Sequence, residues 1–228
     1  MGWTQTWLYW FLKHKQRKRH IRESAQSQYG QDQVVYELLG KPGHGVYVDI
    51  GANDGVTLSN TLLFEQMGWE GVCIEPHPKV FELLQDNRRC PLINACILDQ
   101  NGVVDFVEVD GYANMLSGIK QFFSASHQER IDREIQRHGG AQRTIPIQAI
   151  TFQSIQDLLD LKPIDYLSID TEGCELAILK SIDLKKTLIR SIGVENGSGS
   201  PALFRYLTRN GYDLATCVGC DEIYLRIH

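Results

Sequence analysis

The stretch VYVDIGANDG at residues 46–55 combines an apolar run, a carboxylate and two glycines. The apolar run is typical of a buried strand, and Asp49 stands near its end. Gly51 and Gly55 lack side chains, so they can adopt positive φ or let the backbone approach a ligand closely. A second apolar run ends at Glu75, whose two oxygens could accept hydrogen bonds from ribose hydroxyls. A glycine turn after one strand and an acid after the next predict a nucleoside-binding sheet.

The spacing of the glycines separates two classes of nucleoside cofactor. A dinucleotide site needs the pattern G-x-G-x-x-G, whose second glycine lets the backbone reach a pyrophosphate. Asn53 occupies that position here. The turn therefore favours a ligand with a ribose and no pyrophosphate, and S-adenosylmethionine is the leading candidate. An NAD-dependent oxidoreductase is the alternative enzyme.

A second group of acids, DTEGCE at residues 170–175, follows a later apolar run. Asp170 ends that predicted strand, where it would face a sulfonium cation, and Glu195 with Asn196 ends the neighbouring strand. Asp170, Glu195 and Asn196 could together bind Mg²⁺ through oxygen atoms. Such an ion would lower the pKa of a substrate hydroxyl and orient its oxygen. Alternatively, Asp170 or Glu195 acts alone as a general base, or only orders the loop.

Three segments resemble the FkbM family of S-adenosylmethionine-dependent methyltransferases. They are VDIGANDGVTLSNT (residues 48–61), GWEGVCIEPHP (68–78) and IDYLSIDTEGCE (164–175), and the resemblance extends over roughly residues 28–227. It implies a class I methyltransferase fold and, usually, methyl transfer to a hydroxyl oxygen. The implied acceptor is a hydroxyl on a sugar, polyketide, peptide or other secondary metabolite. Outside the enzymes, a noncatalytic membrane-surface or scaffold protein with this fold is the alternative.

Ligands of open α/β sheets lie at the carboxyl ends of the strands, and this rule assigns roles to the candidates. The predicted cofactor-binding residues are Asp49, Gly51, Ala52, Asn53, Gly55, Glu75, Asn94, Ala95 and Asp170. The backbone of residues 51–55 would contact the methionine part of the cofactor, and Asn94 with Ala95 would lie beside the adenine. Asp49 either contacts the cofactor or holds the amides of the turn.

Apolar runs alternate with amphipathic segments along residues 27–228, which predicts one α/β domain, and the resemblance implies that it is a methyltransferase domain. Such alternation predicts a mainly parallel sheet with helices on both faces, and the last two runs predict a terminal antiparallel pair. The expected strands are 46–50, 72–75, 91–97, 103–109, 144–150, 166–169, 189–195, 212–217 and 222–227. The expected helices are 34–39, 57–67, 78–87, 124–138, 151–159, 173–181 and 200–210. Residues 111–140 fit this alternation poorly and are predicted to form a substrate loop or lid.

The composition is that of an ordinary globular protein, with 228 residues, 43% of them hydrophobic and 22% charged. The net charge of −5 argues against a general nucleic-acid binder. Residues 1–26 form a separate basic aromatic extension, in which residues 1–22 carry six basic residues and no acidic one. This extension could contact an anionic membrane surface through residues 1–22 or pack on the domain or a partner. The sequence predicts a cytoplasmic protein, with peripheral membrane contact as the alternative.

Overall fold

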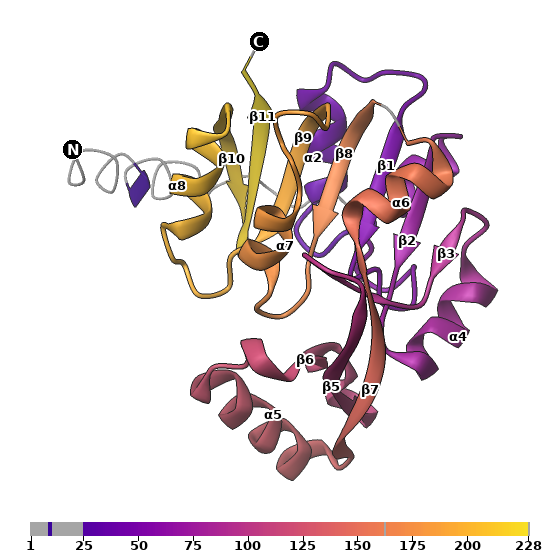
Figure 1. Cartoon of the computed structure of the whole chain (residues 1–228), viewed down its shortest axis with the longest axis vertical. Coiled ribbons are helices and arrows are strands. Elements are labelled where there is room, and N and C mark those ends of the chain that lie inside the picture. The colour runs from indigo at the N-terminus through magenta and orange to yellow at the C-terminus, as the bar shows by residue number, and fades with distance from the viewer. Residues whose placement is uncertain (1–8, 11–24, 162, 228) are drawn as a thin grey trace.

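The computed structural model describes residues 9–10, 25–161 and 163–227. Figure 1 shows that they form two lobes. The larger lobe holds a sheet with helices packed on it, and the smaller lobe lies below it in this view. Two long strands, β5 and β7, run from the larger lobe into the smaller one.

The main sheet has seven strands in the order β10-β11-β9-β8-β1-β2-β3. Among these described strands β11 runs antiparallel to both of its neighbours, and the other neighbouring pairs are parallel. The bounds are β1 Val46–Ile50, β2 Glu70–Ile74, β3 Leu92–Ile93, β8 Ile164–Ile169, β9 Ile189–Glu195, β10 Tyr212–Val218 and β11 Asp221–Arg226. This order is that of a class I methyltransferase, so the predicted mainly parallel sheet with a terminal antiparallel strand is confirmed.

Helices cover both faces of the main sheet, as predicted. On one face lie α2 Gln31–Leu38, α3 Leu62–Gln66 and α4 Pro78–Asn87; on the other lie α6 Phe152–Leu159, α7 Glu175–Ser181 and α8 Ala202–Arg209. Successive strand residues point to opposite faces. Tyr47 therefore packs in the core beneath the first three helices, while Val48 packs in the core beneath the other three. β1 is buried on both faces, which explains its continuous apolar sequence.

The second sheet has four strands in the order β4-β7-β5-β6. Their bounds are β4 Cys96–Leu98, β5 Gly102–Asp110, β6 Gly118–Ile119 and β7 Ala141–Thr151. The 3₁₀ turns η1 Gly111–Leu116 and η2 Lys120–Phe122 and helix α5 Ala125–His138 complete the smaller lobe. Its own core contains Val107, Val109, Ala113, Leu116 and Ile131. Residues 111–140 are thus a packed part of this lobe, and their role as a lid stays a prediction.

Two predicted elements differ from those in the structure. The predicted helix 57–67 is reduced to Leu62–Gln66, because polar side chains before it bind the backbone in another conformation. Asp54 accepts hydrogen bonds from the amides of Val56 and Thr57 at 2.9 and 2.7 Å. The predicted strand 91–97 divides into β3 and β4, which belong to different sheets. The chain therefore leaves the main sheet before it enters the second one.

The structure describes Tyr9 and Trp10 within the basic extension, and Tyr9 belongs to the core of the larger lobe. Its side chain is fully buried, its ring lies 5.4 Å from that of Phe204, and its hydroxyl donates to Glu222 Oε1 at 2.8 Å. Packing on the domain is therefore observed for this residue. The predicted membrane contact falls mostly on residues 1–8 and 11–22, which lie outside the described residues. Among the described helices, none has the length and apolar character needed to cross a bilayer.

Candidate functional site

A cavity of about 720 Å³ opens at the carboxyl ends of β1, β2, β8 and β9, and the smaller lobe forms part of its wall. This volume is in the range of ~300–1,000 Å³ that is usual for small-molecule sites. The predicted residues that line it are Asp49, Gly51, Ala52, Asn53, Glu75, Ala95, Asp170 and Glu195. The smaller lobe contributes Tyr112, Met115 and Arg130, among others. The structure thus brings most of the predicted site residues to one cavity.

The glycine turn is shaped by contacts within the protein as well as by the cavity. Gly51 has φ +87°, and its amide donates to the carbonyl of Ile74 at 2.9 Å. A Cβ atom at Gly51 would lie only 1.7 Å from the carbonyl oxygen of Asp170. A side chain here would therefore separate the ends of β1 and β8. Gly51 is needed for the architecture that places the turn beside Asp170.

Glu75 is held at the edge of the cavity by two backbone amides. Its Oε2 accepts from Asn53 N at 2.9 Å, and its Oε1 accepts from His77 N at 2.8 Å. Burial raises the pKa of Glu75 to about 7, although the amides of His77 and Asn53 oppose that effect. Each carboxylate oxygen has a further lone pair that could accept a hydroxyl hydrogen. The geometry suits the predicted contact with a ribose.

Asp49 has a structural partner although it lines the cavity. Its Oδ2 accepts a hydrogen bond from Thr61 Oγ1 at 2.6 Å, and its side chain is buried. Burial raises the pKa of Asp49, and the bond from Thr61 opposes this rise. The carboxylate therefore orders the segment that leads into α3. Direct contact with a cofactor remains a prediction.

Asp170, Glu172 and Glu195 place three carboxylates on the cavity wall. Burial raises the pKa of Asp170 well above its ordinary value, and the nearby charge of Glu195 raises it further. Burial also raises the pKa of Glu172 to about 7, with Glu195 adding to the rise and Arg130 opposing it. The Asp170 carboxylate accepts no hydrogen bond from any residue that the structure describes. It is therefore the group in this cluster best placed to take up a proton or face a bound cation.

Glu172 also connects the cluster to the smaller lobe. Its Oε2 lies 3.6 Å from Nδ1 of His127 and 3.6 Å from a guanidinium nitrogen of Arg130, both on α5. Glu175, the last acid of the sequence motif, instead accepts hydrogen bonds from the amides of Thr171 and Gly173. The amides of Thr171 and Gly173 thus stabilise Glu175, and Arg130 on α5 stabilises Glu172.

Asn196 corrects the predicted metal site. Its Nδ2 donates to Glu222 Oε1 at 2.7 Å and to the carbonyl of Ser200 at 2.8 Å. Its Oδ1 accepts from the amide of Ser200 at 3.0 Å. Asn196 is buried and is not among the residues that line the cavity. The three-ligand set with Asp170 and Glu195 is therefore not assembled.

Two further predicted residues lie outside the cavity lining. A Cβ atom at Gly55 would lie 2.5 Å from Leu84 and 2.5 Å from Arg88, so this glycine allows close packing inside the protein. Asn94 donates through Nδ2 to the carbonyls of Glu75 and Pro76 at 2.7 and 3.1 Å. It fixes the chain after β2, and its neighbour Ala95 lines the cavity instead.

Arg88 supports the site but was not predicted from the sequence. Its buried guanidinium donates to Glu65 Oε2 at 2.7 Å, to the carbonyl of Gly55 at 3.1 Å and to Thr61 Oγ1 at 3.1 Å. Burial alone would raise the pKa of Glu65, but Arg88, the amide of Arg89 and the hydroxyl of Tyr47 together outweigh it and lower that pKa to about 2. Arg88 thereby joins the glycine turn to the partner of Asp49. In sequence it looks like an ordinary charge after a surface helix.

The match of a family model now identifies the class of protein. The model of the methyltransferase FkbM domain matches residues 49–214, well over half of the chain. The chain belongs to the FkbM methyltransferase family. This membership confirms the resemblance seen in the sequence and makes methyl transfer the general reaction of the FkbM domain. It gives no support to the oxidoreductase alternative.

Similar solved structures are distant in sequence. A candidate RNA methyltransferase from Pyrococcus horikoshii is 11% identical with a TM-score of 0.42, over 100% of this chain and 98% of that chain. A human methyltransferase 10 domain containing protein is 13% identical with a TM-score of 0.35, over 85% of this chain and 78% of that chain. These likenesses are too low to carry an argument about substrate. A comparison with curated proteins finds no match.

Proposed function

We propose that this FkbM-family protein is an S-adenosylmethionine-dependent O-methyltransferase. The observation that carries the proposal is the placement of Glu75 and Asp170 on one cavity, at the ends of strands β2 and β8. These strands flank β1, which ends in the Gly51 turn. A hydrogen-bond acceptor for a ribose and a carboxylate for a cation therefore lie on opposite sides of the same turn.

The cavity residues fit S-adenosylmethionine by charge and by shape. Glu75 would accept hydrogen bonds from the ribose hydroxyls, and the backbone of residues 51–53 would meet the methionine portion. Ala95 is small and would leave room for the adenine ring. The carboxylates of Asp170 and Glu195 would stabilise a positive charge in a partly desolvated cavity. When bound, this cofactor supplies a methyl group on a sulfonium, which is the activated group of the reaction.

The protein must also position the acceptor hydroxyl and remove its proton. We assign the proton transfer to Asp170, with Glu195 as the alternative base. Burial, with the nearby charge of Glu195, raises the pKa of Asp170, and a raised pKa makes its ionised carboxylate a stronger proton acceptor. The acceptor oxygen then attacks in line, so its alignment by the cavity walls contributes much of the rate.

The acceptor that we propose is a hydroxyl on a sugar, polyketide, peptide or other secondary metabolite. Tyr112 and Met115 line the cavity from the smaller lobe and are 71% and 44% exposed, so they offer apolar contact to a small organic molecule. The acidic lining would repel the phosphates of a nucleic acid. Mg²⁺ is left out of the proposal because Asn196 is committed to contacts away from the cavity.

Calorimetric titration tests the proposal. The protein is titrated with S-adenosylmethionine, S-adenosylhomocysteine and NAD, each with and without Mg²⁺. We expect saturable binding of the two sulfur nucleosides, no binding of NAD and no effect of Mg²⁺. Asp170→Asn should still bind S-adenosylhomocysteine, but it should fail to transfer radiolabelled methyl to a panel of hydroxyl acceptors that wild-type protein modifies. Absence of nucleoside binding would favour the noncatalytic scaffold alternative.

A further inference from the structure

His77, Glu108 and Asp110 bring three potential metal ligands together where the two lobes meet. His77 precedes α4, whereas Glu108 and Asp110 lie on β5 of the second sheet. One donor atom from each residue lies within 4.8 Å of the others. Nδ1 of His77 is 3.9 Å from Oε1 of Glu108, and these side chains are only 3% and 1% exposed.

The hydrogen bond that the His77 ring makes through Nε2 determines the state of Nδ1, the ring nitrogen that faces Glu108. Nε2 lies 3.2 Å from the carbonyl oxygen of Val109. A carbonyl can only accept, so Nε2 is the donor of this bond, and the tautomer that carries its one proton there presents a lone pair at Nδ1. Within the described part of the chain, neither Nδ1 of His77 nor Oε1 of Glu108 has a hydrogen-bond partner. Two buried lone pairs that face each other are costly unless a positive group or hydrogen-bond donor lies between them.

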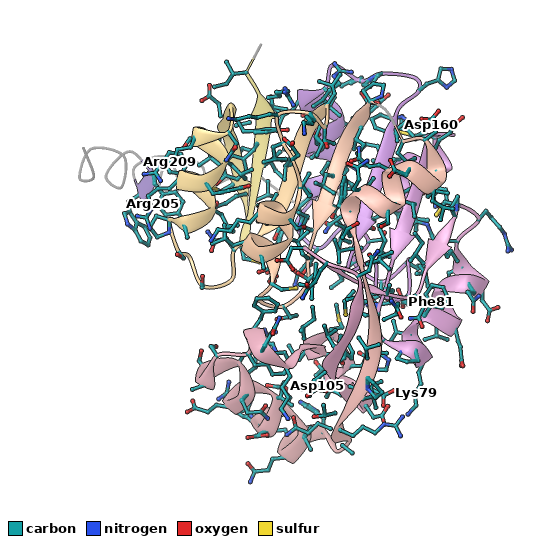
Figure 2. All side chains as sticks on the ribbon, in the orientation of Figure 1. Lys79, Phe81, Asp105, Asp160, Arg205 and Arg209 are labelled. Carbon is teal, nitrogen blue, oxygen red and sulfur yellow. The ribbon has the colours of Figure 1, made fainter. Side chains whose placement is uncertain are left out.

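The outer contacts of the three residues are those expected around a metal ion. Metal-binding histidines usually donate their second N–H to a carbonyl, and metal-binding carboxylates are hydrogen-bonded on their outer side. His77 donates to Val109, and the second oxygen of Glu108 accepts from Nε of Arg143. Lys79, labelled in Figure 2, donates to Asp110 Oδ1 at 2.6 Å. These outer contacts leave Nδ1 of His77 and Oε1 of Glu108 turned toward the space that the cluster encloses.

We propose that His77, Glu108 and Asp110 bind one divalent transition-metal ion, for which Zn²⁺ is the best probe. An imidazole ligand favours transition ions over Mg²⁺ and Ca²⁺. Zinc bonds to nitrogen and oxygen of about 2.0–2.2 Å allow one ion to contact both His77 and Glu108 across their gap. Asp110 offers an oxygen within 4.8 Å of the other two donor atoms and would complete the set.

The ion would join the cofactor end of the main sheet to the smaller lobe. The amide of His77 donates to Glu75 Oε1 at 2.8 Å, so fixing His77 also fixes the carboxylate at the cavity edge. We therefore expect the ion to raise the melting temperature of the protein. This effect does not depend on methyl transfer.

Metal titration of the full chain tests the site. Protein freed of metal with a chelator, which is then removed, is titrated with ZnCl₂ by calorimetry and with Co²⁺ by visible absorption. We expect one tight equivalent for wild type and at least a tenfold weaker affinity in His77→Gln and in Glu108→Gln. The double variant Cys217→Ser with Cys220→Ser removes competing thiols, and Asp170→Asn alters the cavity acids. Both controls should keep the affinity of wild type.

Glu108→Gln keeps an oxygen for the bond from Arg143, so it tests the metal with little change to the second sheet. Circular dichroism verifies the fold of each variant. Three outcomes would overturn the site: no saturable binding by wild type, unchanged affinity in both ligand variants, or loss of binding only in a control variant. The first would mean that a proton or water, rather than a metal, lies between His77 and Glu108.

Discussion

Replacement of Glu75 by glutamine tests the cofactor site most directly. The Glu75 carboxylate is 7% exposed and accepts hydrogen bonds from two backbone amides. Glu75→Gln keeps the shape of the side chain, removes its charge and replaces one acceptor oxygen with an NH₂ donor. One ribose hydroxyl would then lose its acceptor, and the other would keep only a neutral carbonyl oxygen. We expect weaker binding of S-adenosylhomocysteine by a protein that still folds.

The expected loss follows from the number of bonds removed. A hydrogen bond to a charged group contributes about 1.5–3 kcal/mol. Loss of one such bond weakens binding by about 10- to 150-fold, because each ~1.4 kcal/mol is a factor of ten in affinity. A change of less than threefold would refute the assignment of Glu75 to the ribose.

The pH dependence of stability and of cofactor affinity gives a second, independent test of Glu75. Burial raises the pKa of Glu75 to about 7 from an ordinary value of 4.5, so the protein without cofactor loses stability as pH rises from 4.5 to 7. Above pH 7 the ionised carboxylate lowers the free energy of unfolding by about 3 kcal/mol. In the proposed contact with the ribose the carboxylate is ionised, so affinity for the cofactor should fall as pH drops below 7. In Glu75→Gln the affinity trend should disappear, and the loss of stability between pH 4.5 and 7 should shrink by the share that Glu75 contributes, while Glu172 and Asp170 keep theirs.

Calorimetry with S-adenosylhomocysteine between pH 5.5 and 8.5, together with thermal melts, measures both trends. Glu172→Gln is the matched control, because the pKa of Glu172 is also raised to about 7 and this residue lines the same cavity. Glu172 contacts α5 instead of the predicted ribose position. The control should keep the loss of affinity at low pH. If the loss instead vanished in the control and survived in Glu75→Gln, our reasoning would be wrong.

Three further substitutions test the architecture around the site. Gly51→Ala should prevent stable folding, because residue 51 has φ +87° and its Cβ would lie 1.7 Å from a backbone oxygen. Circular dichroism and soluble yield measure this effect. Arg88→Met should cost about 3–5 kcal/mol in urea unfolding because it leaves the carboxylate of Glu65 partly buried without its cation. A urea midpoint equal to that of wild type would contradict this expected loss of stability. Tyr9→Phe should cost about 1–3 kcal/mol by removing a donor from buried Glu222, and an unchanged melting temperature would show that this bond contributes nothing.

The sequence predicted the parts of the site that depend on local chain geometry. Parallel strands place their carboxyl ends at one edge, so the apolar runs before Asp49, Glu75 and Asp170 were sufficient to bring these acids to one cavity. The amphipathic pattern of the segments between them also predicted helices there. Tertiary packing then decided which of the neighbouring residues face the cavity.

The errors arose where long-range partners decide a side chain's role. Asn196 follows Glu195 in sequence, but its amide is bound to Glu222 and Ser200. Arg88 has no distinguishing pattern, because its partners Glu65 and Gly55 are more than twenty residues away. Such contacts depend on tertiary packing, which sequence periodicity does not reveal.

The acids around the cavity differ in what stabilises them, and this difference indicates where the chemistry takes place. Backbone amides hold Glu75 and Glu175, and the guanidinium of Arg130 on α5 faces Glu172. Asp170 accepts no hydrogen bond within the described chain, and burial together with Glu195 raises its pKa. A carboxylate that the fold leaves without a donor is stabilised when it gains a proton or a cationic neighbour. Methyl transfer from a sulfonium to a hydroxyl would provide both, which is why we assign the reaction to Asp170.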